Sequence, residues 1–455
     1  MLITSKNLIK KHKLIAFAIL LTLLGVTGFA ILSATSHIER IQSLDGYLGA
    51  INTQTSESAP QLAWNRTFGG VADSFAYELA LDSNSNIYVV GNTFSTGTGF
   101  SDVLLLKYSP DGVLLWNRTW GVPNRNEFGR GIAIDNQNNI YLTGKTFFTD
   151  PTWGDVLLLK YDPTGNYIWN RTLGAGSGID EGWDLIYSDG VLWITGLTRS
   201  LGGTQDEVLL AKYAINGSQL GAYHWGGIGN DIGFAIALSG SVIFIAGQTN
   251  SFGAGGADAL LVKFDTNGTK IGNWTWGGNQ GDSAKDLIFD GAGFGYLTGS
   301  TENNALLFLV KFNGNGQFIW NRIWGSKGTA VGEGIDIDSN NNPYVVVQMY
   351  DYGAGHTDVL MMGWDSSGNQ PWHTVWGGLL EDASADIEVN NGAIYICGST
   401  TSFGSGGYDF FLLKYSTTTA TSEIPGFQSP ITLFTLLLIL LISTILAPKV
   451  KRMQF

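Results

Sequence analysis

The stretch from Asp155 to Gly174, DVLLLKYDPTGNYIWNRTLG, recurs in close copies along most of this chain. Each copy has an apolar run, a turn signal such as Asp162-Pro-Thr-Gly165 and a second run, which together predict a β-hairpin. The copies share a final apolar residue followed by glycine: Phe68-Gly69, Trp120-Gly121, Leu173-Gly174, Trp225-Gly226, Trp276-Gly277, Trp324-Gly325 and Trp376-Gly377. A spacing of about 48 to 53 residues is typical of a repeat architecture.

A second marker gives the same number of repeats. A lysine followed by an aromatic residue ends the earlier strand of the hairpin at Lys107-Tyr108, Lys160-Tyr161, Lys212-Tyr213, Lys263-Phe264, Lys311-Phe312 and Lys414-Tyr415, with Gly363-Trp364 as a variant. Two independent markers therefore indicate seven repeats.

Each repeat contains four predicted strands, here named a to d, which in the second repeat cover 131–135, 139–145, 155–161 and 167–173. Strand a is short and rich in small residues, b and c are almost continuously apolar, and d alternates. Continuous apolar runs predict strands covered on both faces, and alternation predicts an edge strand facing water. Seven such four-stranded sheets describe an all-β fold, the seven-bladed β-propeller, with strand a at the crowded axis.

The two ends of the repeat region support a closed ring. A d-type strand, Leu62 to Phe68, precedes the first strand a, whereas the last repeat stops after its strand c at Tyr415. Pairing of these two segments would complete the seventh blade. An open solenoid would instead need atypical capping repeats, and none is evident.

These residues resemble a known family. The pattern Asp-x-x-x-Asn-Ile-Tyr-x-x-Gly-x-Thr, as in Asp82 to Thr93 and Asp135 to Thr146, followed by Lys-Tyr and Pro-x-Gly, is similar to the repeats called SBBP repeats. The resemblance covers about residues 62–416. It implies a surface-exposed propeller and no particular chemistry.

The charge is unevenly distributed along the 455 residues, whose net charge is −13. The propeller region is acidic, which disfavours binding to nucleic acid. The single cysteine, Cys397, excludes an intramolecular disulfide.

Both ends carry expected membrane or targeting segments. Four lysines precede the apolar run 14–34, which predicts either a signal anchor helix or a cleavable signal peptide within 1–34, followed by a linker, 35–60. After the propeller (61–416), a linker (417–430) leads to a predicted transmembrane helix (431–447) and a basic cytoplasmic tail (448–455). Pro425, Gly426 and Phe427 make this ending similar to archaeal PGF-type surface-anchoring signals; a plain membrane anchor is the alternative. The propeller is thus expected at the cell membrane, on the extracellular side.

Aspartates recur on one predicted face. They are Asp73, Asp180, Asp231, Asp282 and Asp382 in the d-to-a connections, and Asp102, Asp155, Asp206, Asp258, Asp358 and Asp409 at the start of strand c. A group present in nearly every blade favours a structural role, in which carboxylates bond nearby backbone N–H groups. A cation-binding mouth, with calcium as the ion, is the functional alternative; no other cofactor is evident.

Recognition is expected where the blades differ. The b-to-c loops vary most in length, and Trp153, Tyr350, Tyr352 and His356 are candidate ligand-binding residues there. Six sequons, at Asn65, Asn117, Asn170, Asn216, Asn267 and Asn273, are candidate glycosylation sites.

The sequence lacks the common enzyme signatures. The favoured function is therefore a membrane-anchored binding or scaffolding module whose partner is a surface protein or glycan. The alternative is a surface enzyme with an axial acidic, metal-dependent site.

Overall fold

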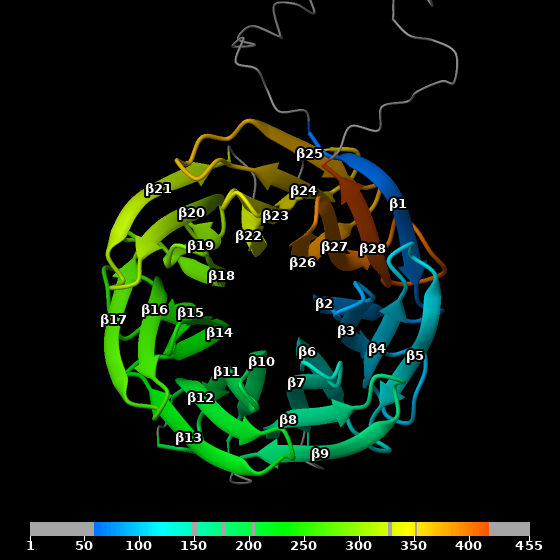
Figure 1. Ribbon diagram of the computed structural model, residues 1–455, viewed down its shortest axis with the longest axis horizontal. Coiled ribbons are helices and arrows are strands. Elements are labelled where there is room, and N and C mark those ends of the chain that lie inside the picture. Colours follow the sequence, from blue (N-terminus) through cyan, green and yellow to red (C-terminus); the bar gives the residue numbers. More distant parts are fainter. Residues whose placement is uncertain are drawn as a thin grey trace, which may run out of the picture. The chain divides into compact units, whose positions relative to one another are not determined.

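A computed structural model describes residues 59–147, 153–174, 178–202, 205–325, 330–350 and 353–417. Within these ranges the strands form seven antiparallel sheets of four strands each. Figure 1 shows the sheets arranged around a central axis, each with its first strand innermost. The seven-bladed all-β propeller predicted from the repeats is confirmed.

The first four blades follow the chain in order. Blade 1 contains β2 (Ser74–Leu81), β3 (Ile87–Thr93), β4 (Asp102–Tyr108) and β5 (Leu114–Trp120). Blade 2 contains β6 (Glu127–Ile134), β7 (Ile140–Phe147), β8 (Gly154–Tyr161) and β9 (Tyr167–Leu173). Blade 3 contains β10 (Asp180–Ser188), β11 (Val191–Thr198), β12 (Glu207–Ala214) and β13 (Gln219–Trp225). Blade 4 contains β14 (Asp231–Ser239), β15 (Val242–Thr249), β16 (Asp258–Asp265) and β17 (Lys270–Trp276).

The remaining blades complete the ring. Blade 5 contains β18 (Ser283–Phe289), β19 (Phe294–Thr301), β20 (Leu306–Asn313) and β21 (Phe318–Trp324). Blade 6 contains β22 (Ala330–Ile337), β23 (Pro343–Tyr350), β24 (Thr357–Gly363) and β25 (Trp372–Trp376). Blade 7 contains β26 (Asp382–Asn390), β27 (Ala393–Thr400), β28 (Asp409–Ser416) and, as its outer strand, β1 (Gln61–Phe68).

The ring closes by pairing the two ends of the propeller. Strand β1 lies antiparallel to β28, with Trp64 opposite Lys414 and Thr67 opposite Phe411. The predicted closure is confirmed. In Figure 1 the blue β1 lies beside the red β28 at the junction of blades 7 and 1.

The middle strands form the core between blades. Every residue of β3 and β4 is buried, whereas β5 alternates between exposed and half-buried residues. Side chains of adjacent blades share one cluster; at the closure, Leu79, Val89 and Leu104 of blade 1 pack with Cys397 and Phe410 of blade 7. Apolar runs on two-sided strands thus bury their residues against both neighbours.

The recurring lysine is explained by contacts between blades. Its ammonium donates a hydrogen bond to a carbonyl in the c-to-d turn of the next blade, as from Lys212 to Thr266 (2.9 Å) and from Lys263 to Gly314 (2.7 Å). Lys414 makes the same bond to Pro110 across the ring closure, at 2.9 Å. The marker that counts the repeats therefore also ties six of the seven blades to the next, and blade 6, with Gly363 in this position, is the exception.

The arginine of Trp-Asn-Arg-Thr reaches the same turn. Arg118 donates through Nε to the Gly165 carbonyl at 2.6 Å, while its guanidinium lies 4.9 Å from the Trp116 ring centroid. Arg66 and Gly112 repeat this arrangement across the closure, at 2.7 Å.

The expected segments 1–34, 35–58 and 418–455 lie outside the described residues, so the structure leaves the predicted end helices untested. In the part of the chain that is described, no helix is long and apolar enough to cross a membrane.

Candidate functional site

The innermost strand of every blade contains a β-bulge at the same position. The ladder to the second strand shifts at Ala76/Glu78 in blade 1, Gly129/Gly131 in blade 2, and at equivalent positions in the other five blades. The residues left unpaired are Tyr77, Arg130, Trp183, Phe234, Lys285, Glu333 and Ala385. All seven line a cavity at the propeller axis. Bulges re-aim side chains in this way, often beside functional sites.

The sequence pattern placed strand a of the second repeat at 131–135, but β6 begins earlier, at Glu127. The bulge at Arg130 is the physical reason, because an extra residue breaks the alternation that marks a strand. The axial side chains were therefore missed.

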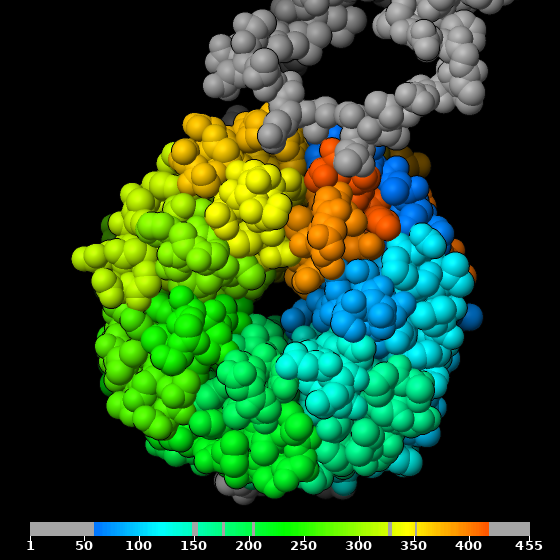
Figure 2. Space-filling view, viewed as in Figure 1, coloured from blue at the N-terminus to red at the C-terminus, as the bar shows by residue number. Residues whose placement is uncertain are grey.

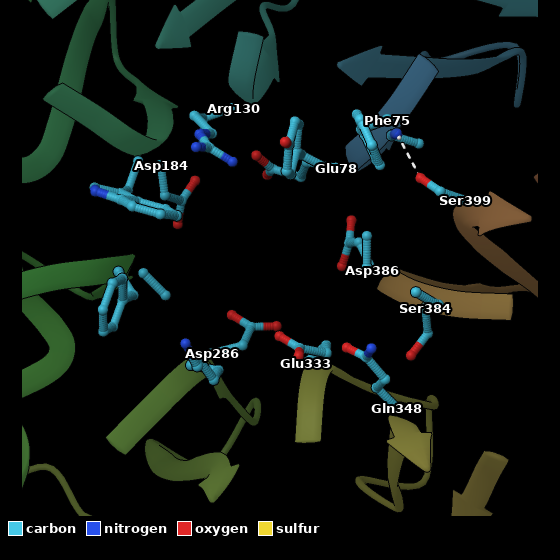
Figure 3. A pocket seen from close by; sticks show the side chains of 18 of the residues that line it. Phe75, Glu78, Arg130, Asp184, Asp286, Glu333, Gln348, Ser384, Asp386 and Ser399 are labelled. Carbon is cyan, nitrogen blue, oxygen red and sulfur yellow. Dashed lines mark hydrogen bonds between the residues drawn. The ribbon is translucent and has the colours of Figure 1, made fainter. Parts of the chain in front are cut away.

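The axial cavity has a volume of about 420 Å³. Figure 3 shows the side chains of Glu78, Asp184, Asp286, Glu333 and Asp386 arranged around one opening. They come from blades 1, 3, 5, 6 and 7. In the space-filling view the ring is hollowed at its centre (Figure 2).

Aromatic rings and two cations form one layer of the cavity wall. The Arg130 guanidinium lies between the Tyr77 and Trp183 rings, 4.2 and 4.5 Å from their centroids, and Nε is 3.1 Å from Glu181 Oε1. Lys285 Nζ lies 4.5 Å from the Phe234 centroid. Among the described residues, no carboxylate pairs with this lysine within 4.0 Å.

The residue after each bulge alternates between acidic and small around the ring. In blade order these residues are Glu78, Gly131, Asp184, Ala235, Asp286, Gly334 and Asp386. Each acidic side chain accepts a backbone N–H of the following blade: Glu78 from Ile132 (2.9 Å), Asp184 from Ile236 (2.8 Å), Asp286 from Ile335 (2.8 Å) and Asp386 from Leu79 (2.9 Å). The acidic layer thus links neighbouring blades at the axis.

The small members of this layer make room for their acidic neighbours. A Cβ at Gly131 would lie 2.9 Å from the Asp184 Cα, and one at Gly334 would lie 3.0 Å from the Asp386 Cα. Seven is odd, so the alternation fails once, and Glu78 and Asp386 lie in adjacent blades.

Burial raises the pKa of the axial carboxyls. It raises the pKa of Asp184 to about 7 and that of Asp286 to about 8. For Glu78, burial and then the charges of Asp184 and Asp386 raise the pKa well above its usual value. Burial also raises the pKa of Asp386 well above the ordinary range, and the charge of Asp286 adds to this. Burial therefore favours the neutral form of these carboxyls.

Two further carboxyls, those of Asp336 and Glu388, lie on inner strands two residues after Gly334 and Asp386. Asp336 in β22 accepts the Val389 N–H at 2.6 Å, and burial raises its pKa to about 6. Burial, followed by the charge of Asp336, raises the pKa of Glu388 well above its usual value.

Among the described residues, two buried polar groups of the cavity lining, Ser384 Oγ and Trp183 Nε1, have no hydrogen-bond partner. Ser384 is 6% exposed and lines the cavity, and its Oγ makes no hydrogen bond to any residue that the structure describes. Buried hydroxyls normally find a partner. Its neighbour Ser399, by contrast, accepts the Ala76 N–H at 3.1 Å, the bond drawn in Figure 3.

The aspartates predicted on one face lie elsewhere, and none of them lines the axial cavity. Most accept backbone N–H groups of adjacent loops. The donors are Tyr408 for Asp73, Gly99 for Asp102, Gly227 for Asp231, Ala254 for Asp258, Gly278 for Asp282, Gly355 for Asp358, Gly378 for Asp382 and Ser405 for Asp409. These are the bonds expected of loop-capping groups.

Three members of this set have other surroundings. Asp180 accepts the Thr198 hydroxyl and the Arg199 N–H, and Asp206 pairs with the Arg199 side chain. Burial and the charge of Asp180 raise the pKa of Asp155. In the described part of the chain, no group of three or more His, Cys, Asp or Glu residues is placed to hold a metal ion.

The rim candidates are not gathered into one site. Trp153 belongs to blade 2, and Tyr350 and His356 belong to blade 6, which is not its neighbour; all three are exposed. Tyr350 contacts the cavity wall indirectly, because its hydroxyl accepts from Gln348 Nε2 at 3.2 Å and Gln348 lines the cavity. Tyr352 lies outside the described residues, as do Pro425, Gly426 and Phe427.

The sequons lie on the outside of the ring. Asn65, Asn117, Asn170 and Asn273 are in the outer strands β1, β5, β9 and β17, and Asn216 and Asn267 are in c-to-d turns. Asn65, Asn117, Asn216 and Asn267 are exposed, and the other two are half-buried.

Comparison with known proteins supports the repeat. Residues 120–147 match the family model of the SBBP beta-propeller repeat. The match covers strands β6 and β7 of blade 2 and the connection that leads into them.

Longer similarities are weak. The regulatory protein FlaEY of Caulobacter vibrioides is 26% identical over 175 residues, which are 33% of this chain and 18% of that protein. The chain therefore spans less than a fifth of that relative's length. Two solved structures are each 9% identical in sequence to this chain. The phage phi92 endosialidase has a TM-score of 0.45, and the match covers 80% of this chain and 71% of that chain. The Kuenenia stuttgartiensis hydrazine synthase has a TM-score of 0.47, and the match covers 76% of this chain and 96% of that chain.

Proposed function

We propose that this chain is a cell-surface binding module that receives its ligand in the axial cavity. The observation that carries the proposal is the convergence of carboxyl side chains from five blades on one cavity of about 420 Å³. That volume is within the range of small-molecule pockets, roughly 300 to 1,000 Å³. Carboxyls with strongly raised pKa values cost folding free energy, and such groups gather at functional sites.

The cell-surface part of the proposal rests on the ends of the chain. The lysine-rich start with its apolar run, and the apolar segment followed by a basic tail, support export of the propeller and anchoring by one or two helices. Sequons on the outer strands agree with this location. Protease digestion of intact cells tests it: the propeller should be released, and its survival without cell lysis would place it inside.

Ligand binding is tested with the full-length chain on glycan and peptide arrays. Ala385 occupies the bulge position that carries Trp183 in blade 3, so Ala385→Trp should fold and fill the cavity. We expect this variant to lose binding and Trp153→Ala, at the rim, to retain it. The reverse result would move the ligand site from the axis to the rim.

An enzyme acting at the same cavity is the second candidate. The pKa of about 7 at Asp184 favours it, because a carboxyl that is protonated near neutral pH can serve as a general acid. Turnover of model glycosides and esters by the wild type, lost in Asp184→Asn, would favour catalysis. Binding without turnover would favour the binding module.

Calcium is the remaining proposal for the aspartate-bearing face. If that face binds the ion, calcium should raise the melting temperature. An unchanged melting temperature across divalent ions would leave the aspartates as loop caps alone.

A further inference from the structure

We infer that the axial cavity takes an uncharged sugar ring, an inference that rests on the proposed binding function. It starts from the mixed chemistry of the cavity wall. Arg130 and Lys285 lie in the same cavity as Glu78, Asp184, Asp286, Glu333 and Asp386. A cationic ligand would meet the two basic groups, and an anionic ligand would meet the fraction of the carboxyls that is ionised at neutral pH, as at Asp184 with a pKa of about 7. A neutral ligand that both donates and accepts hydrogen bonds avoids repulsion by the basic groups and repulsion by the carboxylates.

The protonation of the acidic layer points the same way. A carboxyl held neutral by burial can donate one hydrogen bond and accept others, and a carboxylate only accepts. Sugar hydroxyls also donate and accept, so they can satisfy these groups in either state. Backbone N–H groups fix the direction of each carboxyl in the alternating layer. Glu78 accepts from Ile132 and Asp184 accepts from Ile236. Asp286 and Asp386 each accept at both oxygens, from Leu287 and Ile335 and from Ile387 and Leu79, so Glu78 and Asp184 offer the ligand more hydrogen-bonding capacity.

Ser384 supplies an independent observation. The residue is 6% exposed and lines the cavity, as Gln348 does, and its buried hydroxyl lacks a partner among the described residues. A ligand hydroxyl would satisfy it. A metal ion would not explain the site, since the described residues offer no group of three metal-ligating side chains.

The apolar part of the wall suits the carbon face of a sugar. Phe75 and Tyr408 pack with their ring centroids 5.0 Å apart, and both line the cavity. The inner strands begin at the face that carries the d-to-a and b-to-c loops. These two rings therefore lie nearer that face, while Glu78 and Asp386 lie deeper. The arrangement places apolar surface toward that face and hydrogen-bonding groups below it.

The test compares neutral and acidic oligosaccharides on one array with the full-length wild type, and measures the best neutral glycan by isothermal titration calorimetry. We expect neutral glycans to bind and sialylated or uronic acid glycans to bind at least 10-fold more weakly. Ser384→Ala should weaken the neutral glycan about 3- to 10-fold, the loss of one hydrogen bond. Ala385→Trp should abolish binding, and Leu115→Ala, at an exposed position of the outer strand β5, should leave it unchanged.

The opposing outcomes are distinct. Equal or tighter binding of acidic glycans, or a peptide bound in their place and lost in Ala385→Trp, overturns the sugar inference while the axial binding function stands. Glycan binding that is lost in Trp153→Ala but kept in Ala385→Trp overturns the axial site. No binding to glycan or peptide by a wild type with a sharp melting transition overturns the proposed function itself.

Discussion

At the scale of single residues, glycine is required after strand d because an aspartate carboxylate occupies the space that a side chain would need. A Cβ at Gly121 would lie 1.4 Å from Asp102 Oδ1, and one at Gly69 would lie 1.5 Å from Asp409 Oδ1. The backbone at these glycines does not adopt a positive φ, so close approach alone requires the missing side chain. The sequence showed that this glycine recurs, but the reason is a contact with another strand.

Gly121→Ala should therefore destabilise the fold. The added methyl group must displace the buried Asp102 side chain, at a cost of about 2–4 kcal/mol in the free energy of unfolding. Urea denaturation measures it. Gly278→Ala is the matched control, since no atom lies within 4 Å of its Cβ position. A cost for Gly121→Ala no larger than that of the control would contradict the steric explanation.

At the scale of elements, outer strands with the same sequence motif have different structural roles. Strands β1 and β5 both contain Trp-Asn-Arg-Thr, and both pair with the c strand of their blade. However, β5 only covers an edge, whereas β1 joins the start of the propeller to its end. The closure was predictable because the unpaired strands at the two ends are complementary in the repeat pattern.

Thr67→Pro and Thr119→Pro place the same change at the same position of these two strands. Proline removes a backbone donor and disrupts pairing. We expect Thr119→Pro to cost about 1–2 kcal/mol, and Thr67→Pro to cost about 2–4 kcal/mol because it also opens the ring. Equal losses in urea denaturation would show that closure by β1 adds no stability.

At the scale of the whole molecule, an odd number of blades determines the electrostatics of the axis. Acidic and small residues alternate around the ring until Asp386 and Glu78 meet in neighbouring blades. Burial raises the pKa of both; at Glu78 the charges of Asp184 and Asp386 add to it, and at Asp386 the charge of Asp286 adds to it. An even-bladed ring with the same alternation would have no such adjacent pair.

Stability should consequently fall as pH rises. A carboxyl whose pKa is higher in the folded state binds its proton more tightly when folded. Its cost to stability is absent below the unfolded pKa of about 4 and grows as pH rises through the folded values, about 7 for Asp184 and about 8 for Asp286. We expect the axial carboxyls to lower the melting temperature between pH 5 and pH 8.

Glu78→Gln should reduce this loss of stability at high pH. The amide oxygen can still accept the Ile132 N–H, but the charge near Asp184 and Asp386 is gone. At pH 8 the variant should be more stable than the wild type by roughly 1–3 kcal/mol, since one pKa unit corresponds to about 1.4 kcal/mol. At pH 5 the two should be nearly equal. The exposed Asp111→Asn is the control, and a lower melting temperature for Glu78→Gln at pH 8 would contradict the argument.

The chain itself determines the propeller, because strand-length apolar runs, turn residues and the repeat period are local or periodic features that can be read along the sequence. Blade number, two-sided middle strands and closure by Leu62 to Phe68 follow from them. Only the tertiary structure shows that Glu78, Asp184, Asp286 and Asp386 share one cavity. They are far apart along the chain, and the bulges that turn their neighbours toward the axis recur in every blade but carry a different residue type in each one. Their raised pKa values are likewise decided by burial and by charges on other blades, which exist only once the ring has closed.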